Sequence, residues 1–365
     1  MKKRRQKKRP RRRPRVKSSS NHSSSLIWTI SALDGLQDLV RKELMNRFRK
    51  DCEILKHSRN DEIHFYYTGP RQNLLTITTA QTLLLRRDFN VARPRTLLHA
   101  EHIAKLTELV MEAQSIKGAE PVSSFRIDAA GSGSPTMLRL AEELESALSL
   151  PFSPSNGDCL LVLRPGKEGW EVLCRIGPRP LATRPWRQVN YRGSLNAAIA
   201  ACMVELTRPR RENRYLNLMC GSGTLLIERL LRQRVKTAVG IDNSDTAVSA
   251  AVKNAQAAGV ISGALIQLGD ARQLEFPDNA FTTITADLPY GEHLGSRSSN
   301  LELYRATVAE ATRVCARGGC MVLLSQDIGS LTTVLKELAG KWRIVNERRI
   351  VQREYRPACT TLIRL

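Results

Sequence analysis

Hydrophobic and polar positions follow one pattern before residue 180 and another after it. Before it, short apolar runs and amphipathic segments alternate with prolines, a pattern typical of small α+β units. Apolar residues at 36, 39, 40, 44 and 48 recur with the helical period, which predicts a helix over 34–49. The other expected elements of this half are strands over 26–30, 62–67, 123–127, 159–164 and 170–176, with helices over 99–114 and 136–148.

From about residue 194 the pattern changes to apolar strands separated by amphipathic helices. This alternation predicts a mostly parallel, doubly wound sheet. In such sheets, ligands bind beyond the carboxyl ends of the strands, where the strand order reverses. The expected strands are 215–218, 237–241, 264–268, 281–286, 319–325, 343–350 and 359–364, and the expected helices are 194–207, 224–234, 244–258, 301–316 and 328–339.

Positive charge is concentrated at the start of the chain. Residues 2–17 hold twelve Lys and Arg and no acidic residue, within a chain whose net charge is +22. Residues 18–25 are polar and offer nothing to bury, so we expect residues 1–25 to be a disordered basic tail. The excess of positive charge favours a polyanionic partner, and we expect the tail to contact RNA phosphates. A solubilising tail is the alternative.

Composition also narrows the class of protein. No run of eighteen apolar residues is present, so we expect no transmembrane span, and the first residues do not resemble a secretory signal. The eight cysteines form no Cys-x-x-Cys pair and have no accompanying histidine cluster, so a metal site is not expected. Cysteines in apolar segments indicate reduced core residues and a cytoplasmic protein.

The first strand of the C-terminal half ends in the sequence NLMCGSGT. Gly221 and Gly223 would let the backbone approach a ligand at the start of the next helix. Leu226 stands where a dinucleotide fingerprint has its third glycine. Asp242 closes the second strand, where a carboxylate can accept from ribose hydroxyls, and Asp270 follows the third, placed to accept from an amino group such as that of adenine. Each aspartate alone has an alternative as a helix N-cap, but together they favour a nucleoside cofactor.

The fourth strand ends in DLPYG. Asp287 and the carbonyl of Leu288 can accept from both N–H bonds of an amino group, while Tyr290 stacks on a planar ring. Pro289 stiffens the loop and frees neighbouring backbone groups to point outward. The loop therefore suits a planar substrate with an amino group; a proline turn with an aromatic plug is the alternative.

These four loops resemble those of a class I S-adenosylmethionine-dependent methyltransferase of the amino-methylating type, in which DLPYG takes the place of an Asp/Asn-Pro-Pro-Tyr motif. RPWRQVNYRGSLNAAIAACMVEL, over 184–206, is similar to the segment that precedes this fold in THUMP-domain RNA methyltransferases of the UPF0020 type. ALDGLQDLVRKEL, over 32–44, resembles the start of their ferredoxin-like unit, and FRIDAAGSGSP, over 125–135, is THUMP-like. The family is that of the THUMP-containing tRNA guanine-N2 methyltransferases, and the resemblance covers residues 26–365.

The resemblance implies an α/β fold: a Rossmann-like class I methyltransferase domain with a mostly parallel seven-stranded sheet, preceded by α+β ferredoxin-like and THUMP domains. The implied divisions are a basic tail over 1–25, a ferredoxin-like unit over 26–95, a THUMP-like RNA-binding domain over 96–180 and the methyltransferase domain over 181–365.

The resemblance also assigns residues. The family commonly has Asp where Asn217 stands and Pro where Leu288 stands. Ser194 and Leu195 fall on the segment that lines the methionine end of S-adenosylmethionine. The implied cofactor-binding residues are Ser194, Leu195, Asn217, Gly221, Gly223, Asp242, Asp270 and Ala271. The implied catalytic residues are Asp287, Leu288, Pro289 and Tyr290.

The implied reaction transfers a methyl group from S-adenosylmethionine to the exocyclic amine (N2) of a guanosine, with tRNA as the expected partner. Two alternatives stay open: methylation of rRNA guanine-N2 or of adenine-N6, and a non-catalytic RNA-binding assembly factor that keeps the fold. The missing third glycine and the DLPYG loop disfavour a NAD-dependent oxidoreductase.

Overall fold

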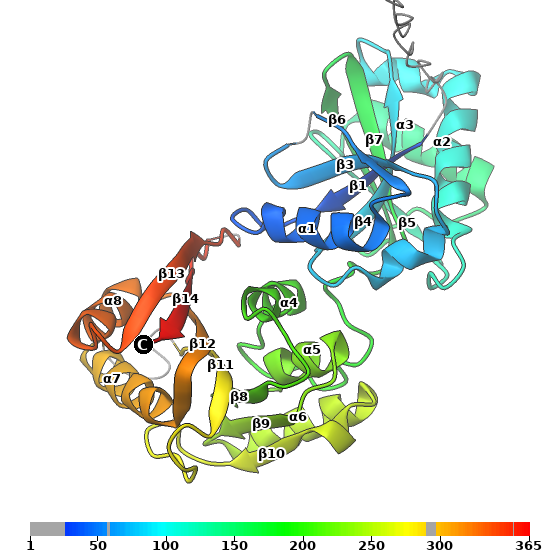
Figure 1. Ribbon diagram of the computed structural model, residues 1–365. Helices are drawn as coiled ribbons and strands as arrows, with labels where there is room; N and C mark the ends of the chain where they lie inside the picture. Colours follow the sequence, from blue (N-terminus) through cyan, green and yellow to red (C-terminus); the bar gives the residue numbers. More distant parts are fainter. Residues whose placement is uncertain (1–25, 57–58, 290–296, 353) are drawn as a thin grey trace, which may run out of the picture.

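The structure, a computed structural model, describes residues 26–56, 59–289, 297–352 and 354–365 (Figure 1). The expected disorder and RNA contacts of the basic tail, and the expected stacking by Tyr290, therefore concern residues outside the described part. In the described part, no helix is long and apolar enough to span a membrane. The same residues contain no cluster of three or more His, Cys, Asp or Glu placed to hold a metal ion.

The N-terminal unit is a single seven-stranded sheet covered by helices. Its elements are β1 (Ile27–Ser31), α1 (Gln37–Phe48), β2 (Cys52–Ile54), β3 (Glu62–Tyr67), the 3-10 helix η1 (Arg71–Thr76), β4 (Thr82–Phe89), the 3-10 helix η2 (Pro94–Leu98), α2 (Ala100–Gln114), β5 (Phe125–Ala129), α3 (Pro135–Leu148), β6 (Cys159–Gly166) and β7 (Gly169–Arg175). The strand order is β2-β3-β1-β4-β7-β6-β5.

One pairing joins what the sequence suggested were two separate units. β4 lies antiparallel to β7, with Leu85 opposite Cys174. The side chains buried against the sheet accordingly form one continuous hydrophobic core that runs from Trp28 to Ile176. The helices follow their sequence signals: Pro135 begins α3, and the Ser134 hydroxyl caps it by accepting from the Met137 amide.

The C-terminal domain is a second seven-stranded sheet with helices on its faces. Its elements are α4 (Ala197–Leu206), β8 (Arg214–Leu218), α5 (Thr224–Arg232), β9 (Thr237–Asp242), α6 (Asp245–Ala257), the 3-10 helix η3 (Ile261–Gly263), β10 (Leu265–Leu268), β11 (Phe281–Asp287), α7 (Arg297–Val314), β12 (Cys315–Ser325), α8 (Ile328–Glu337), β13 (Trp342–Arg349) and β14 (Ala358–Arg364). The strand order is β10-β9-β8-β11-β12-β14-β13.

The order of these strands fixes where a ligand can bind. The neighbours among β10, β9, β8, β11 and β12 are parallel, whereas β14 runs antiparallel to both β12 and β13. The chain moves outward from β8 through β9 to β10 and then returns to the other side of β8 at β11. The loops after β8 and β11 therefore meet at the point where the strand order reverses. The predicted mostly parallel sheet is confirmed.

The two halves are tied together by α1 and by the segment before β4. Leu36 and Leu39 share an apolar cluster with Ile199 and Met203 of α4, and α1 lies over α4 in Figure 1. An isolated β-bridge joins Asp34 to Val351. The contact combines apolar packing with backbone pairing.

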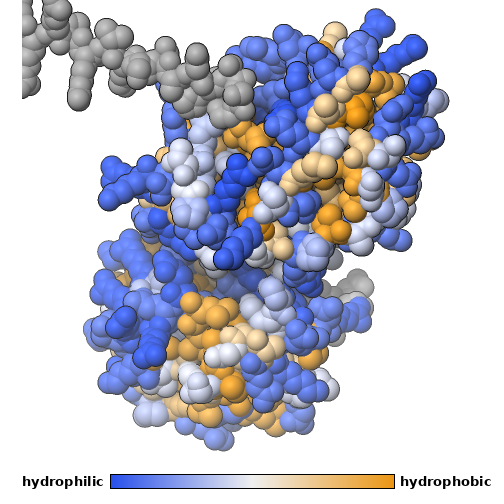
Figure 2. Space-filling model, turned by 90° about the vertical axis from the view of Figure 1, so that its right-hand side faces the viewer, coloured by the Kyte–Doolittle hydropathy of each residue, from blue (hydrophilic) through white to orange (hydrophobic). Residues whose placement is uncertain are grey.

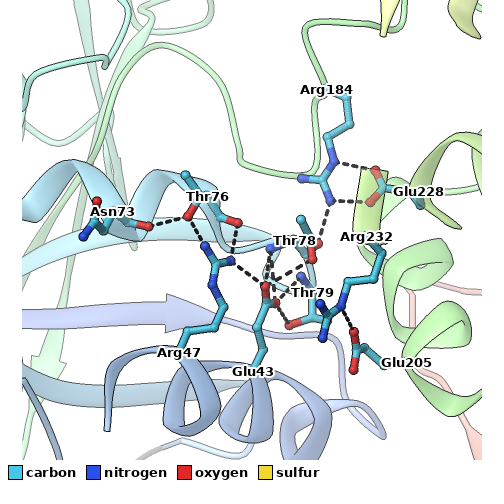
Figure 3. A network of polar contacts seen from close by, with 10 residues as sticks. All are labelled: Glu43, Arg47, Asn73, Thr76, Thr78, Thr79, Arg184, Glu205, Glu228 and Arg232. Carbon is cyan, nitrogen blue, oxygen red and sulfur yellow. Dashed lines mark hydrogen bonds and ion pairs between the residues drawn. The ribbon is translucent and has the colours of Figure 1, made fainter. Parts of the chain in front are cut away.

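A polar network extends this contact (Figure 3). The carboxylate of Glu43, on α1, accepts from the backbone amides of Thr78 and Thr79 at 2.9–3.1 Å. Arg184 donates to the Thr78 carbonyl at 2.6 Å and to the buried Glu228 carboxylate of α5 at 2.7 Å. One guanidinium therefore binds both halves, in addition to the apolar cluster and the β-bridge.

Candidate cofactor and substrate site

The loop after β8 has a backbone that favours glycine. Met219, Gly221 and Gly223 all have positive φ, of 49°, 52° and 82°. A Cβ on Gly223 would lie 3.1 Å from the Cβ of Ala251, so this glycine permits close packing between the loop and α6. A Cβ on Gly221 would meet no atom within 4 Å, so its open side is left for a ligand.

Asp242, at the end of β9, holds this loop. One of its carboxylate oxygens accepts from the Gly221 amide at 2.8 Å, and the other accepts from the Ser244 amide at 3.1 Å. The side chain is partly exposed, and each oxygen keeps a second lone pair. The predicted ribose acceptor therefore lies beside the predicted glycine loop, and it also positions that loop.

Asn217 presents a buried acceptor at the end of β8. Its side chain is fully buried, and the amide nitrogen donates to the carbonyls of Leu218 and Thr285, both at 3.2 Å. Its Oδ1 has no hydrogen-bond partner among the described residues. A buried acceptor without a donor is unfavourable unless a ligand supplies one. The unpaired oxygen suits an ammonium group.

Ser194 and Leu195 lie against the same loop. The Ser194 hydroxyl is 2.9 Å from that of Ser222 and donates to the Tyr191 carbonyl at 2.6 Å. Arg187 donates to the Leu195 carbonyl at 2.7 Å and to the Thr224 hydroxyl at 3.0 Å. These hydrogen bonds join the segment before α4 to the glycine loop and to the start of α5; the role of Ser194 and Leu195 toward the methionine end of a cofactor stays a prediction.

Asn254 is a positioning residue that the sequence reasoning missed. Its side-chain oxygen Oδ1 accepts from the backbone amides of Gln188 and Val189 at 2.9 Å each. Its side-chain nitrogen Nδ2 donates to the Ser222 carbonyl at 3.1 Å. It is fully buried on α6. The sequence did contain a signal for this role: Asn254 stands on the otherwise apolar face of an amphipathic helix. A buried side-chain amide needs several hydrogen-bond partners, so its position there indicates a structural contact.

Asp270 and Ala271 follow β10. The Asp270 carboxylate accepts from the Arg272 amide at 2.8 Å and pairs with its guanidinium at 2.7 Å, and this ion pair lowers the pKa of Asp270. Ala271 is buried. The Gly269 amide donates to the Asp242 carbonyl at 2.9 Å, which joins this loop to the ribose position. The role of Asp270 toward adenine stays a prediction.

The loop after β11 is held in place from its buried side. The Leu288 side chain is buried, and its amide donates to the Leu324 carbonyl at 2.8 Å. The Pro289 carbonyl accepts from the Tyr304 hydroxyl at 2.7 Å, and that hydroxyl lies 3.1 Å from the Ser325 hydroxyl. Tyr304, fully buried on α7, is a second positioning residue that the sequence reasoning missed. Tyr290 lies outside the described residues.

Asp287 has the electrostatics of a functional carboxyl. Part of its surface is exposed, but protein atoms surround the carboxyl, and this burial raises its pKa to about 7. No described residue gives the side chain a hydrogen bond or an ion pair. A buried carboxyl without a partner at the end of a parallel strand is a candidate active-site group.

The register places these loops at one edge of the sheet. Leu218 of β8 lies opposite Ile241 of β9 on one side and Ala286 of β11 on the other. Asp242 comes one residue after Ile241, and Asp287 comes one residue after Ala286. The two aspartates therefore lie on either side of the glycine loop, separated by two strand spacings, or about 10 Å. The loop predicted to bind a nucleoside and the loop predicted to bind an amine are therefore neighbours.

This strand order and this site define the fold of a class I methyltransferase. TrmN from Thermus thermophilus has the same fold: its crystal structure superimposes with a TM-score of 0.75, at 21% identity, covering 93% of this chain and 100% of that one. Residues 184–356 match the family UPF0020, RMKL-like, methyltransferase domain. This segment is therefore similar to that family, as the sequence had indicated.

Two curated relatives are similar to part of this chain. The tRNA (guanine(6)-N(2))-methyltransferase THUMP3 of Mus musculus is 29% identical over 167 residues, which cover 42% of this chain and 33% of that protein. The tRNA (guanine(10)-N2)-dimethyltransferase of Methanothermobacter thermautotrophicus is 32% identical over 149 residues, which cover 40% and 43%. The chain thus spans less than half the length of these relatives.

Proposed function

We propose that this protein transfers a methyl group from S-adenosylmethionine to N2 of a guanosine in tRNA. The observation that carries the proposal is the Asp287 carboxyl, which has no partner among the described residues and lies beside the glycine loop where the strand order reverses. The names of both curated relatives, tRNA guanine-N2 methyltransferases, support the choice of base and RNA.

The residues around the glycine loop fit S-adenosylmethionine. The free Oδ1 of Asn217 can accept from the ammonium group, the Asp242 carboxylate from the ribose hydroxyls, and the open side of Gly221 leaves room for the ligand. Asn217 would bind the ammonium as a neutral acceptor where the family commonly has a carboxylate. When bound, the cofactor supplies an electrophilic methyl group.

The loop after β11 would orient the amine. The lone pair of a guanine amino group is delocalised into the ring, so the nitrogen is a weak nucleophile. The Asp287 carboxylate and the Leu288 carbonyl would accept from its two N–H bonds and aim the nitrogen. The ionised carboxylate would also stabilise the positive charge that develops on nitrogen and take the proton afterwards. A pKa of about 7 suits this proton transfer at neutral pH.

The proposal is tested by supplying the full chain with S-adenosylmethionine and, separately, purified tRNA, rRNA and small nuclear RNA. Mass spectrometry of the digested nucleosides should show N2-methylguanosine from tRNA. N6-methyladenosine, or product from rRNA alone, would replace the proposal with the corresponding alternative. If calorimetry detects no cofactor binding and no RNA is methylated, the result contradicts the proposal and favours the non-catalytic alternative.

Asp242→Ala should weaken S-adenosylmethionine binding roughly tenfold or more, because removing hydrogen bonds to a ligand costs about 1–3 kcal/mol. The structure adds a second reason, since the substitution also frees the Gly221 amide that shapes the loop. Calorimetry measures the change. Asp245→Ala, on the exposed first turn of α6, is the matched control. Unchanged cofactor binding by a folded Asp242→Ala protein would contradict the assignment.

Deleting residues 2–17 tests the expected phosphate contacts of the tail. RNA affinity should fall, and the slope of its logarithm against the logarithm of salt concentration should flatten by about 0.7–0.9 for each phosphate that the tail neutralises. Turnover at saturating RNA should stay unchanged, since the tail holds no candidate catalytic group. Filter binding over a salt series measures the slope; equal slopes would favour the solubilising-tail interpretation.

A further inference from the structure

A groove runs between α2 and α3 on the helical side of the N-terminal unit. It has a volume of about 780 Å³, and an apolar floor that includes Leu98, Ile103 and Met111. The Met111 side chain is 56% exposed, unusually high for a large apolar residue. Figure 2 shows apolar surface between hydrophilic residues on the face of this unit that is turned to the viewer.

The rim of the groove is acidic. Glu108 and Glu112 of α2 and Glu143 of α3 line it. Glu108 pairs with Arg87 at 2.6 Å and Glu112 with Arg71, whereas Glu143 has no hydrogen bond or ion pair with any described residue. The groove thus presents at least one free carboxylate above an apolar floor. We refer to these floor and rim residues as the acidic groove.

The two helices have a net negative charge, whereas the whole chain has a net positive charge. Together α2 and α3 carry six Glu against one Lys and one Arg, in a protein of net charge +22. Arg87 and Arg71 already pair with Glu108 and Glu112, so the remaining carboxylates of the two helices supply the negative charge that attracts a cation. The ligand chemistry that fits is a basic peptide whose long side chains lie on the apolar floor and carry their charges to the rim.

The basic tail of this chain is such a peptide, and the first described strand, to which it is connected, lies beside the groove. Residues 2–17 contain twelve Lys and Arg and no acid. Ile27, the first residue of β1, lies opposite Arg86 of β4. The next residue, Arg87, reaches α2, where it donates to the Lys105 carbonyl and to Glu108. The ten residues from 17 to 27 can span about 30 Å, so the tail reaches the groove with slack.

We propose that the acidic groove binds residues 2–17 of the same chain when no polyanion competes. The tether keeps the tail at a high effective concentration near the groove, so weak exposed ion pairs suffice for docking. RNA offers many more anionic groups than the rim and displaces the tail. The groove therefore holds the tail away from other anions until RNA is present.

Trypsin tests the docking, because it cleaves after Lys and Arg and the tail is rich in both. In the full chain at low salt, a docked tail should be cleaved about fivefold more slowly than the tail of the double variant Glu108→Gln, Glu143→Gln. Intact-mass spectrometry over time measures the rate. At about 1 M salt the difference should vanish, since screening weakens exposed pairs.

The matched control is the double variant Glu212→Gln, Glu275→Gln, which removes two exposed acids of the C-terminal domain. It should be cleaved as slowly as the unaltered chain, and melting curves should show that all the proteins are folded. Equal cleavage of the groove variant and the unaltered chain at low salt would overturn the proposal. Protection that grows with protein concentration would also overturn it, because the tail would then bind a second copy.

Discussion

Asp287→Asn should nearly abolish methyl transfer and at the same time stabilise the fold. Asparagine keeps the shape of the side chain but cannot carry the negative charge or take a proton, so turnover should fall by a factor of about 100 or more. Cofactor binding should stay largely intact, because none of the hydrogen bonds that hold the glycine loop involves Asp287. Radiolabelled methyl transfer and calorimetry measure the two effects.

The gain in stability follows from the raised pKa. An aspartate in the unfolded chain ionises near pH 3.8, whereas the folded group ionises near 7. Between these values the unfolded chain loses the proton while the folded protein keeps it, so stability falls as pH rises through this window. Asp287→Asn removes this decrease in stability, because asparagine does not ionise. The variant should be more stable by about 2 kcal/mol above pH 7, after allowance for the partial exposure, and no more stable at about pH 3.5.

The same titration predicts the pH dependence of the unaltered enzyme. Because the ionised carboxylate is the acceptor, turnover should rise with pH through about 7 and level off above it. Asp245→Asn, at an exposed position in the first turn of α6, is the control: it should leave turnover unchanged and lower stability by at most about 1 kcal/mol, since it removes a charge that favours the helix N-terminus. Near-normal turnover by Asp287→Asn on tRNA would show that the loop after β11 is only structural.

Glu228→Ala should be among the most destabilising single substitutions in this chain. Glu228 is 3% exposed and bonds Arg184, which also donates to the Thr78 carbonyl across the contact between the two halves (Figure 3). Removing the carboxylate leaves a buried guanidinium unpaired, which costs about 3–5 kcal/mol. Urea denaturation should show this destabilisation as a lower midpoint.

A neighbouring ion pair provides the matched control. Glu205 pairs with Arg232, whose side chain is 46% exposed, so Glu205→Ala should lower stability by only about 0–1 kcal/mol. The double variant Arg184→Met, Glu228→Leu should recover much of the stability, since it removes both buried charges together. A decrease below about 1 kcal/mol for Glu228→Ala would show that water compensates the guanidinium.

Local order was predictable to within a few residues because it depends on side chains that are close in the chain. The strand over 62–67 was predicted with the observed bounds, and the predicted helix over 136–148 is α3, Pro135–Leu148. The helix predicted over 301–316 ends earlier, at Val314, because β12 begins at Cys315 to pair with β11 at Phe281. That pairing joins segments more than thirty residues apart, which no local period reveals.

The candidate site was predictable in part for the same reason. Gly221, Asp242 and Asp287 were found because each ends or follows a strand whose apolar run is visible, and parallel strands end at one edge. Arg187 and Asn254 were missed because they act through buried contacts with groups distant in the chain, such as the bond from Asn254 to the Ser222 carbonyl.

The sequence by itself determined the alternation of strands and helices, the strand-end motifs and the charge of the tail, since all three depend on neighbouring residues. Only the tertiary structure decided that β4 and β7 join the N-terminal strands into one sheet, because edge strands with similar alternation can pair in several ways. It also decided the raised pKa of Asp287 and the acidity of the groove, because burial and surface charge depend on which distant segments pack together.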